Sequence, residues 1–254
     1  MGSFRFLDLD LARHGAYKEH VLAPLREPAV PGIPEPLFLD CGTCLGQDLR
    51  KLIADGAPPH RVWASDIEPQ FIESGFKLFR DGDKLPRDHF LCPGNLFAES
   101  AEDLAEDKLS ILHGRVTILH ITAVFHLFNL DNHKRIVNRC LQLLRKDTGT
   151  PMLVVGAHVG CHKPGHFYRE GSVAGHKYQH SAESWEALWR DICGQPQWKD
   201  KIANIEVKSK MYERVRNDEN PDADEIATLS EADPLSEERL WQMFEVWVTF
   251  KPEQ

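Results

Sequence analysis

An acidic residue followed by two glycines is the first part of this sequence whose residue types could do chemistry. Asp40 ends an apolar run, Gly42 and Gly46 follow it, and the turn between them holds Thr43 and Cys44. Residues with small side chains allow backbone N–H groups and the N-terminus of a helix to approach a ligand closely. These five residues therefore predict the floor of a pocket for a nucleotide-like ligand.

Polar residues, each beside an apolar or small one, follow three more predicted strands: Asp66 with Ile67, Asn95 with Leu96, and Thr122 with Ala123. Asp66 comes one helix and one strand after Asp40, where an acid can accept hydrogen bonds from ribose hydroxyls. Asn95 and Leu96 suit the edge and the face of an adenine ring. Together the four strand ends predict a nucleoside pocket.

These residues can meet only if a sheet positions them, and the apolar pattern alternates between strand and helix periods. The predicted strands are Pro36–Cys41, Arg61–Asp66, His89–Cys92, Val116–Ile121 and Met152–Ala157, and the predicted helices between them are Leu45–Asp55, Pro69–Phe79, Ala101–Lys108 and Asn132–Leu144. Strands separated by helices favour right-handed crossovers and a mostly parallel sheet with helices on both faces. We therefore expect an α/β, doubly wound, Rossmann-like fold, in which ligands bind at the carboxyl ends of the strands.

The two ends of the chain depart from this alternation of strands and helices. Arg13–Leu25 predicts one amphipathic helix within an N-terminal helical cap, residues 1–30, and a loop is predicted over Gly160–His180. Ser181 could cap a helix over Ala182–Ile192. Two β-rich runs, Ile202–Tyr212 and Leu240–Phe250, follow without a crossover helix between them and predict an antiparallel hairpin at the edge of the sheet.

Length and composition suggest one soluble domain. The chain has 254 residues, 42% of them hydrophobic, which is enough for one large core. No window approaches the roughly 20 apolar residues of a membrane span, and residues 1–10 show no apolar signal core. Six scattered cysteines suggest reduced thiols and no structural disulfide. We expect a single domain, residues 1–254, in the cytoplasm, and leave a homodimer open.

The net charge of −9 comes from one segment. Nine acidic residues and no lysine or arginine lie between Asn217 and Glu238, so the remainder of the chain is close to neutral. A neutral surface lacks the broad basic face that nucleic-acid binding requires. We therefore expect a small-molecule substrate, no nucleic acid, and a solvated acidic loop over residues 217–238 before the last strand.

Two phosphate-binding motifs are missing from the first turn. Cys44 stands where the dinucleotide fingerprint G-x-G-x-x-G has its second glycine, and no Lys-Ser or Lys-Thr pair follows Gly46. This argues against NAD-dependent dehydrogenases and P-loop nucleotide hydrolases. A ligand with ribose and adenine but no phosphate fits better, and S-adenosylmethionine is such a ligand.

At these residues the chain resembles the class I S-adenosylmethionine-dependent methyltransferases, and in particular the fungal secondary-metabolite branch. The resemblance is carried by the segments Leu39–Leu52, Ala64–Glu68, Gly75–Asp81 and Phe125–Phe128. That branch includes carboxyl methyltransferases of meroterpenoid pathways. The resemblance runs from about Tyr17 to the last predicted strand and implies S-adenosylmethionine as the cofactor.

The resemblance also implies roles for individual residues. Asp40, Gly42 and the Cys44–Gly46 turn would surround the methionine portion of the cofactor, and Asp66 would hold the ribose. Thr122 and Ala123 would line the sulfonium side, and Asn95 and Leu96 the adenine, although many class I enzymes have an acid where this chain has Gly94-Asn95. Tyr17 and His20 would cover the cofactor or touch the substrate.

The reaction that the resemblance implies is O-methylation of a carboxylate, an acceptor that is ionised near pH 7 and needs no general base. A phenol or another hydroxyl would need one, and His126 or His158 could serve, since histidine titrates near neutral pH. A protein that binds the cofactor without transferring methyl, such as a cyclase, an isomerase or a partner-binding subunit, is a third alternative.

Two other groups of residues, one of cysteines and one rich in histidine, allow a different interpretation. Cys41-Gly42-Thr43-Cys44 is formally a C-x-x-C motif, which can carry out thiol–disulfide exchange. Histidines and a cysteine between His158 and His180 could bind zinc, but their spacing is irregular and is broken by Gly160, Pro164 and Gly165. We interpret them as surface-loop residues and predict no metal.

Overall fold

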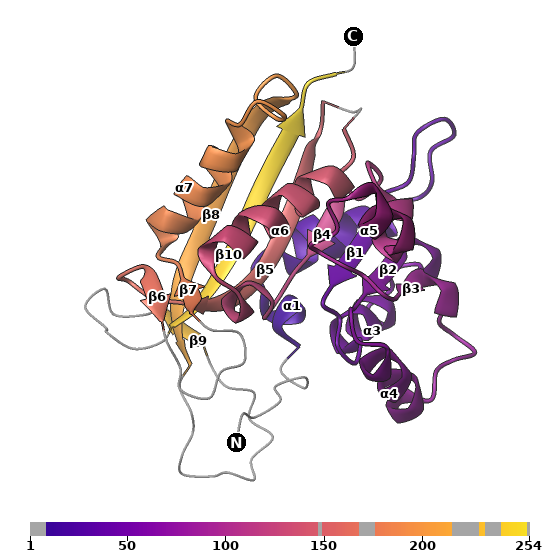
Figure 1. Cartoon of the computed structure of the whole chain (residues 1–254). Helices are drawn as coiled ribbons and strands as arrows, with labels where there is room; N and C mark the ends of the chain where they lie inside the picture. Colours follow the sequence, from indigo (N-terminus) through magenta and orange to yellow (C-terminus); the bar gives the residue numbers. More distant parts are fainter. Residues whose placement is uncertain (1–8, 147–148, 168–175, 215–228, 232–239, 253–254) are drawn as a thin grey trace, which may run out of the picture.

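A sheet of eight strands organises the part of the chain that the structure describes (Figure 1). This computed structural model describes residues 9–146, 149–167, 176–214, 229–231 and 240–252. The strands are β1 Phe38–Cys41, β2 Val62–Ser65, β3 Phe90–Leu91, β4 Ile118–His120, β5 Pro151–Gly160, β8 Ile202–Arg214, β9 Leu229–Glu231 and β10 Leu240–Phe250. Their order is β3-β2-β1-β4-β5-β10-β8-β9. The first five are parallel, as predicted, and β10 is antiparallel to both β5 and β8.

Helices cover both faces of the sheet. The longer ones are α3 Gln47–Ala54, α4 Pro69–Phe79, α6 Leu130–Leu143 and α7 Ala182–Cys193, with the shorter α5 Ala101–Glu106. Side chains of successive strand residues point to opposite faces. Leu39 therefore packs in the core under α6 and α7, whereas Phe38 packs in the core under α3 and α4. Figure 1 shows α6 and α7 side by side across one face.

Short helices complete the connections between strands. They are η2 Pro59–Arg61, η3 Arg87–His89, η4 Lys108–Leu112 and η5 Phe125–Leu127. Ser181 caps α7, as predicted: its hydroxyl accepts a hydrogen bond from the Ser184 backbone N–H. No helix among the described residues has both the length and the apolar character that crossing a membrane requires.

The predicted helix over Arg13–Leu25 is wrong, because the chain forms three short pieces there. They are α1 Asp10–Arg13, the π-helix η1 Tyr17–Leu22 and α2 Ala23–Arg26. The break follows from His14, whose Nδ1 accepts the Ala16 backbone N–H at 3.1 Å in place of a helical carbonyl. The periodic apolar residues Tyr17 and Val21 are nevertheless buried, and this burial produced the helical pattern.

The predicted loop over Gly160–His180 is also wrong in part. It contains a two-stranded antiparallel sheet formed by β6 Gly165–Phe167 and β7 Lys177–Gln179. The predicted pairing of the last two long strands is confirmed, although β10 lies inside the sheet between β5 and β8. The predicted acidic loop, residues 217–238, lies outside the described residues except for β9.

Candidate functional site

A cavity of about 1030 Å³ lies at the carboxyl ends of β1, β2, β3 and β4. The loops that follow these strands line one half of it, together with residues of α3 and α4. Residues 126–128, together with residues of β5, β7 and β10, line the other half. We call these the strand-end half and the β7 half. The position is the one expected for ligand binding in a parallel α/β sheet.

The structure brings most of the predicted site residues to this cavity. Its lining includes Asp40, Gly42, Thr43, Cys44, Asp66, Ile67, Asn95, Leu96, Thr122, Ala123 and His126. Gly46, His158, Tyr17 and His20 are not part of the lining. The four strand ends therefore meet at the cavity. Tyr17 and His20, the predicted N-terminal contacts, do not line it.

The turn after β1 is held by the end of β2. The backbone N–H groups of Gly42 and Thr43 both donate to the Ser65 carbonyl at 2.9 Å. Gly42 has φ +73°, and a Cβ atom there would lie 2.6 Å from Cγ2 of Val124. Cys44 also has a positive φ, 51°, which costs free energy for a residue with a side chain. The strained turn therefore has no room for larger groups and keeps backbone close to the cavity.

Asp66 links this turn to the start of α4 while it faces the cavity. Its Oδ2 accepts the Cys44 N–H at 2.9 Å, and its Oδ1 accepts the Glu68 N–H at 3.0 Å. Burial raises the pKa of its carboxyl. Each carboxylate oxygen can accept more than one hydrogen bond, so both can still accept from a ligand hydroxyl.

Asp40 is paired with a histidine that the sequence analysis did not select. Asp40 and His120 are partners across β1 and β4, and His120 Nδ1 lies 2.7 Å from Asp40 Oδ1. The Thr43 hydroxyl donates to Asp40 Oδ2 at 2.6 Å, and Thr122 Oγ1 lies 2.8 Å from His120 Nε2. Burial acts to lower the pKa of His120, but the nearby carboxylates outweigh it and raise the pKa, chiefly through Asp40.

A second buried carboxylate, Asp48, lies in α3 beside this pair. Its Oδ1 accepts the Leu11 backbone N–H at 3.1 Å, which ties α1 to α3. Burial raises the pKa of Asp48 to about 6, and Asp40 acts in the same direction. With Asp10 and Asp66, the strand-end half is lined by four carboxyl groups, one of which, Asp40, is paired with His120. Such a lining attracts a cationic ligand group.

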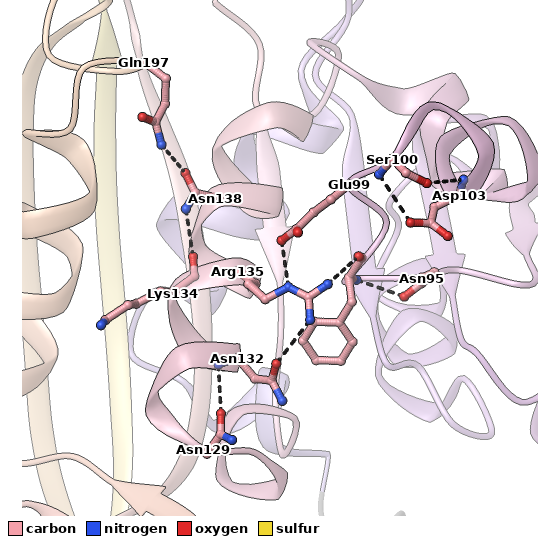
Figure 2. A network of polar contacts seen from close by, with 11 residues as sticks. Asn95, Glu99, Ser100, Asp103, Asn129, Asn132, Lys134, Arg135, Asn138 and Gln197 are labelled. Carbon is pink, nitrogen blue, oxygen red and sulfur yellow. Dashed lines mark hydrogen bonds and ion pairs between the residues drawn. The ribbon is translucent and has the colours of Figure 1, made fainter.

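The loop that carries Asn95, Leu96 and Phe97 is fixed from behind by two arginines of α6. The Asn95 N–H donates to Asp107 Oδ1 at 2.9 Å, and Asp107 forms a buried ion pair with Arg139. Figure 2 shows the second anchor, Arg135. It donates to the Phe97 carbonyl at 2.9 Å and to the carboxylate of Glu99 at 2.7 Å.

The β7 half differs in chemistry. Val159, Leu240, Trp241 and the chain from His126 to Phe128 give it an apolar and aromatic wall, and Lys177 and Gln179 of β7 add polar groups. Among the described residues, Lys177 is the only lysine or arginine that lines the cavity. The cavity therefore has an acidic half and a half with one cation.

The four predicted residues outside the lining have other contacts. His158 is buried, with Nε2 3.0 Å from Gln242 Oε1. The Tyr17 hydroxyl donates to Asp55 at 2.6 Å, and His20 packs edge-on against Trp247. Gly46 has φ +74° and precedes α3 directly, so its role is to begin that helix.

The competing redox and metal interpretations find no support in the described residues. All six cysteines are free thiols, and burial raises the pKa of both Cys41 and Cys44, which disfavours the reactive thiolate. The described residues contain no group of three or more His, Cys, Asp or Glu side chains placed to hold a metal ion. The surface-loop interpretation is wrong for His158 and His180, which are 1% and 2% exposed.

Sequence reasoning missed several residues of the lining: Asp10, Asp48, His120, Lys177, Gln179 and Trp241. His120 had a signal, since it is a polar residue in an apolar strand, two positions before Thr122 and hence on the same face. Lys177 had none, because β7 was predicted as part of a loop.

Comparisons with known proteins agree with this geometry. The chain is 32% identical over 215 residues to O-methyltransferase phiE of a fungal species (strain ATCC 74256), covering 84% of this chain and 66% of that protein. It is 28% identical over 195 residues to methyltransferase ausD of Aspergillus calidoustus, covering 76% of this chain and 63% of that protein. The chain thus spans slightly less than two thirds of the length of these relatives.

A solved structure supports the predicted fold. A SAM-dependent methyltransferase from Archaeoglobus fulgidus matches 98% of this chain and 95% of its own, with a TM-score of 0.51 at 12% identity. This likeness confirms the doubly wound fold with an antiparallel strand. No protein-family model matches the chain.

Proposed function

We propose that this chain, which has the class I methyltransferase fold and is a relative of fungal secondary-metabolite methyltransferases, binds S-adenosylmethionine and transfers its methyl group to a small organic acceptor. The observation that carries the proposal is the strand-end half of the cavity, where Asp40, Asp66 and the Gly42–Cys44 turn meet. The residues of this lining suit the ribose, the adenine and the positively charged groups of that cofactor.

Each part of the cofactor has a chemical counterpart in the cavity. Asp66 accepts hydrogen bonds from the ribose hydroxyls. Ile67, 61% exposed although apolar, and Leu96 offer surfaces that an adenine ring would cover. Asp40 and Asp48 line the cavity and would supply the anionic neighbours that the positive sulfonium and ammonium groups need.

S-adenosylmethionine, when bound, supplies a methyl group on a cationic sulfur that needs no further activation. The residues of this chain then have three tasks: to hold the acceptor in line with that methyl group, to exclude water, and to complement charge. The apolar wall of the β7 half, which includes Phe128 and Trp241, excludes water from the acceptor.

Within this activity we favour O-methylation of a carboxylate. Lys177 provides the cation that an anionic acceptor needs, and it makes no ion pair with the other described residues. An ammonium that contacts one carboxylate oxygen leaves the lone pairs of the other oxygen free to attack. The acceptor is ionised near neutral pH, so no general base is required.

A hydroxyl acceptor is the second candidate, and the position of His126 in the cavity lining supports it. A histidine can take the proton of a phenol near neutral pH. His158 does not line the cavity and is not part of either proposal.

Methyl transfer can be tested with S-adenosylmethionine labelled in its methyl group and a panel of aromatic carboxylic acids paired with the corresponding phenols. Mild alkali releases labelled methanol from a methyl ester but not from an aryl methyl ether, so the product itself distinguishes the two acceptors. We expect alkali-labile label that falls at least ten-fold in Lys177→Met. Alkali-stable label that is lost in His126→Gln would favour the hydroxyl acceptor. Cofactor binding without transfer to any acceptor would favour a non-methylating protein.

A further inference from the structure

Two buried histidines lie behind the β7 half of the cavity without lining it. His133 is in the first turn of α6 and is 1% exposed, and His180 directly follows β7 and is 2% exposed. Neither has a role in the chemistry proposed above. A polar side chain buried this deeply costs free energy unless its hydrogen bonds are satisfied, so their partners indicate what they do.

The hydrogen bonds of this pair have a defined direction. His133 Nε2 lies 2.6 Å from the Phe125 carbonyl, which can only accept, so Nε2 donates. Burial lowers the pKa of His133 to about 4, so the ring is neutral at pH 7 and its Nδ1 accepts. That Nδ1 lies 3.1 Å from His180 Nε2, which therefore donates. His180 Nδ1 in turn accepts from the Ser184 hydroxyl at 2.9 Å.

This chain of hydrogen bonds joins two walls of the cavity. The Phe125 carbonyl belongs to η5, and residues 126–128 that follow it line the cavity from one side. Lys177 and Gln179 line it from β7, and the Tyr178 N–H between them donates to the Phe128 carbonyl at 2.9 Å. The hydrogen bond from His180, directly after β7, to His133 of α6 therefore reinforces the backbone bond from Tyr178 of β7 to Phe128, directly after η5.

We propose that the His133–His180 hydrogen bond is a positioning device that holds β7 against η5 and so fixes Lys177 and Gln179 relative to His126. The proposal rests on the proposed function only in treating the β7 half of the cavity as the acceptor site. His133 and His180 act through other residues and touch no reacting atom.

The wild-type protein tests the direction of these hydrogen bonds without any substitution. In ¹⁵N spectra of histidine-labelled protein at pH 7, both rings should be neutral and carry their proton on Nε2. An Nδ1-protonated tautomer, or a charged ring, at either position would overturn the proposed link.

Substitutions test the positioning role. His180→Gln keeps an amide N–H that can donate to His133 and an oxygen that can accept from Ser184, whereas His180→Leu keeps only volume. His158→Leu is the matched control, because it also removes a buried histidine, but one whose hydrogen bond goes to Gln242. Hydrogen exchange of the Tyr178 amide, measured without any ligand, should be at least ten-fold faster in His180→Leu and within two-fold of wild type in the other two variants.

Binding and kinetics separate this inference from the proposed function. Affinity for S-adenosylhomocysteine should stay within two-fold in all three variants, because the strand-end half is untouched. For the acceptor found with the methyl-transfer panel, KM should rise about ten-fold in His180→Leu and be restored in His180→Gln. If wild-type protein fails to bind S-adenosylhomocysteine, the proposed function fails, while the exchange data still decide the inference.

Unchanged exchange at Tyr178 in His180→Leu would overturn the positioning role, as would equal damage in His180→Gln and His180→Leu. Should His180→Leu not fold, Ser184→Ala removes the hydroxyl that donates to His180, together with the hydrogen bond that this hydroxyl accepts from the Ser181 backbone N–H. It should accelerate Tyr178 exchange in the same direction by a smaller factor, and no acceleration would count against the proposal.

Discussion

Asp66 and Asp48 both face the cavity as buried carboxylates, yet their surroundings give them different roles. Asp66 receives two backbone N–H groups, one on each carboxylate oxygen, and both oxygens can accept further hydrogen bonds. Asp48 receives the Leu11 N–H and a long hydrogen bond, 3.4 Å, from the Gln47 side chain, and its pKa is raised to about 6. We therefore expect Asp66 to act by hydrogen bonding and Asp48 to act by charge.

Asp66→Ala should weaken the binding of S-adenosylhomocysteine by ten- to a hundred-fold, because hydrogen bonds to a charged group contribute about 1.5–3 kcal/mol each. Isothermal titration calorimetry measures this directly. Asp88→Ala, which removes an exposed carboxylate, is the control and should bind as wild type does. Unchanged affinity in Asp66→Ala would refute the assignment of the ribose site.

The charge of Asp48 predicts a pH dependence that differs between two ligands. Below a pKa of about 6 its carboxyl is protonated and no longer attracts the sulfonium of S-adenosylmethionine. From pH 7.5 to 5, affinity for S-adenosylmethionine should therefore fall several-fold more than affinity for S-adenosylhomocysteine, whose sulfur is neutral. In Asp48→Asn this difference should disappear, and a persistent difference would assign the effect to another group.

At the scale of elements, α6 serves as the support of the site although it contributes no residue to the cavity lining. Its Arg135 and Arg139 hold the loop after β3 from behind, and its His133 holds the turn after β4. The guanidinium of Arg135 also lies over the Phe97 ring, 5.0 Å from its centre. The geometry of two strand-end loops thus depends on one helix.

Arg135→Ala should loosen the loop that carries Leu96 and Phe97 and reduce affinity for S-adenosylhomocysteine by about three- to ten-fold. Lys134→Ala is a close control, since this lysine neighbours Arg135 on the same helix (Figure 2) and, among the described residues, forms its ion pair with Asp131 at 3.4 Å. Exposed ion pairs of that kind contribute roughly 0–1 kcal/mol, so its affinity should not change. Equal affinity in both variants would show that the loop is held without Arg135.

At the scale of the whole molecule, stability near neutral pH depends on histidines that are buried in the neutral form. Burial lowers the pKa of His14 and His133 to about 4, and that of His180 to about 3. Between these values and 6.5 the unfolded chain binds more protons than the folded one, so stability falls as pH falls. Asp48 opposes this trend, and so do Asp66 and His120, because a raised pKa stabilises the fold at low pH.

Urea unfolding at pH 7.5 and pH 5 should therefore show a lower free energy of unfolding at pH 5. The expected loss is about 2 kcal/mol for each of the three histidines, offset by about 1 kcal/mol from Asp48. His180→Gln should reduce the difference between the two pH values, whereas His60→Gln, at a side chain that is 62% exposed, should not. Equal stability of wild type at both pH values would contradict the burial of neutral histidines.

Much of the fold followed from local patterns. The helix over Pro69–Phe79 was predicted with the bounds it has, since Pro69 suits a first turn and its apolar face is periodic. The turn after β1 was recognisable from two residue types alone: the acid Asp40 at the end of a strand and the glycine Gly42 after it. By contrast, the strand over Lys177–Gln179 depends on a contact with a distant residue, the Phe128 carbonyl, which no local pattern records. The break at His14 depends on a local bond from the Ala16 N–H to the His14 ring, which the apolar period does not record.

The sequence by itself determined the parallel strands with the helices between them, the acid-and-glycine turn, and the residues that follow these strands, because backbone propensity and apolar period are local properties. Tertiary structure alone decided which side chains share the cavity. It placed His120 against Asp40 and brought Lys177 to the opposite wall. It also moved His158 into the core and set the pKa values, because burial and charge pairing arise only when segments distant along the chain pack together.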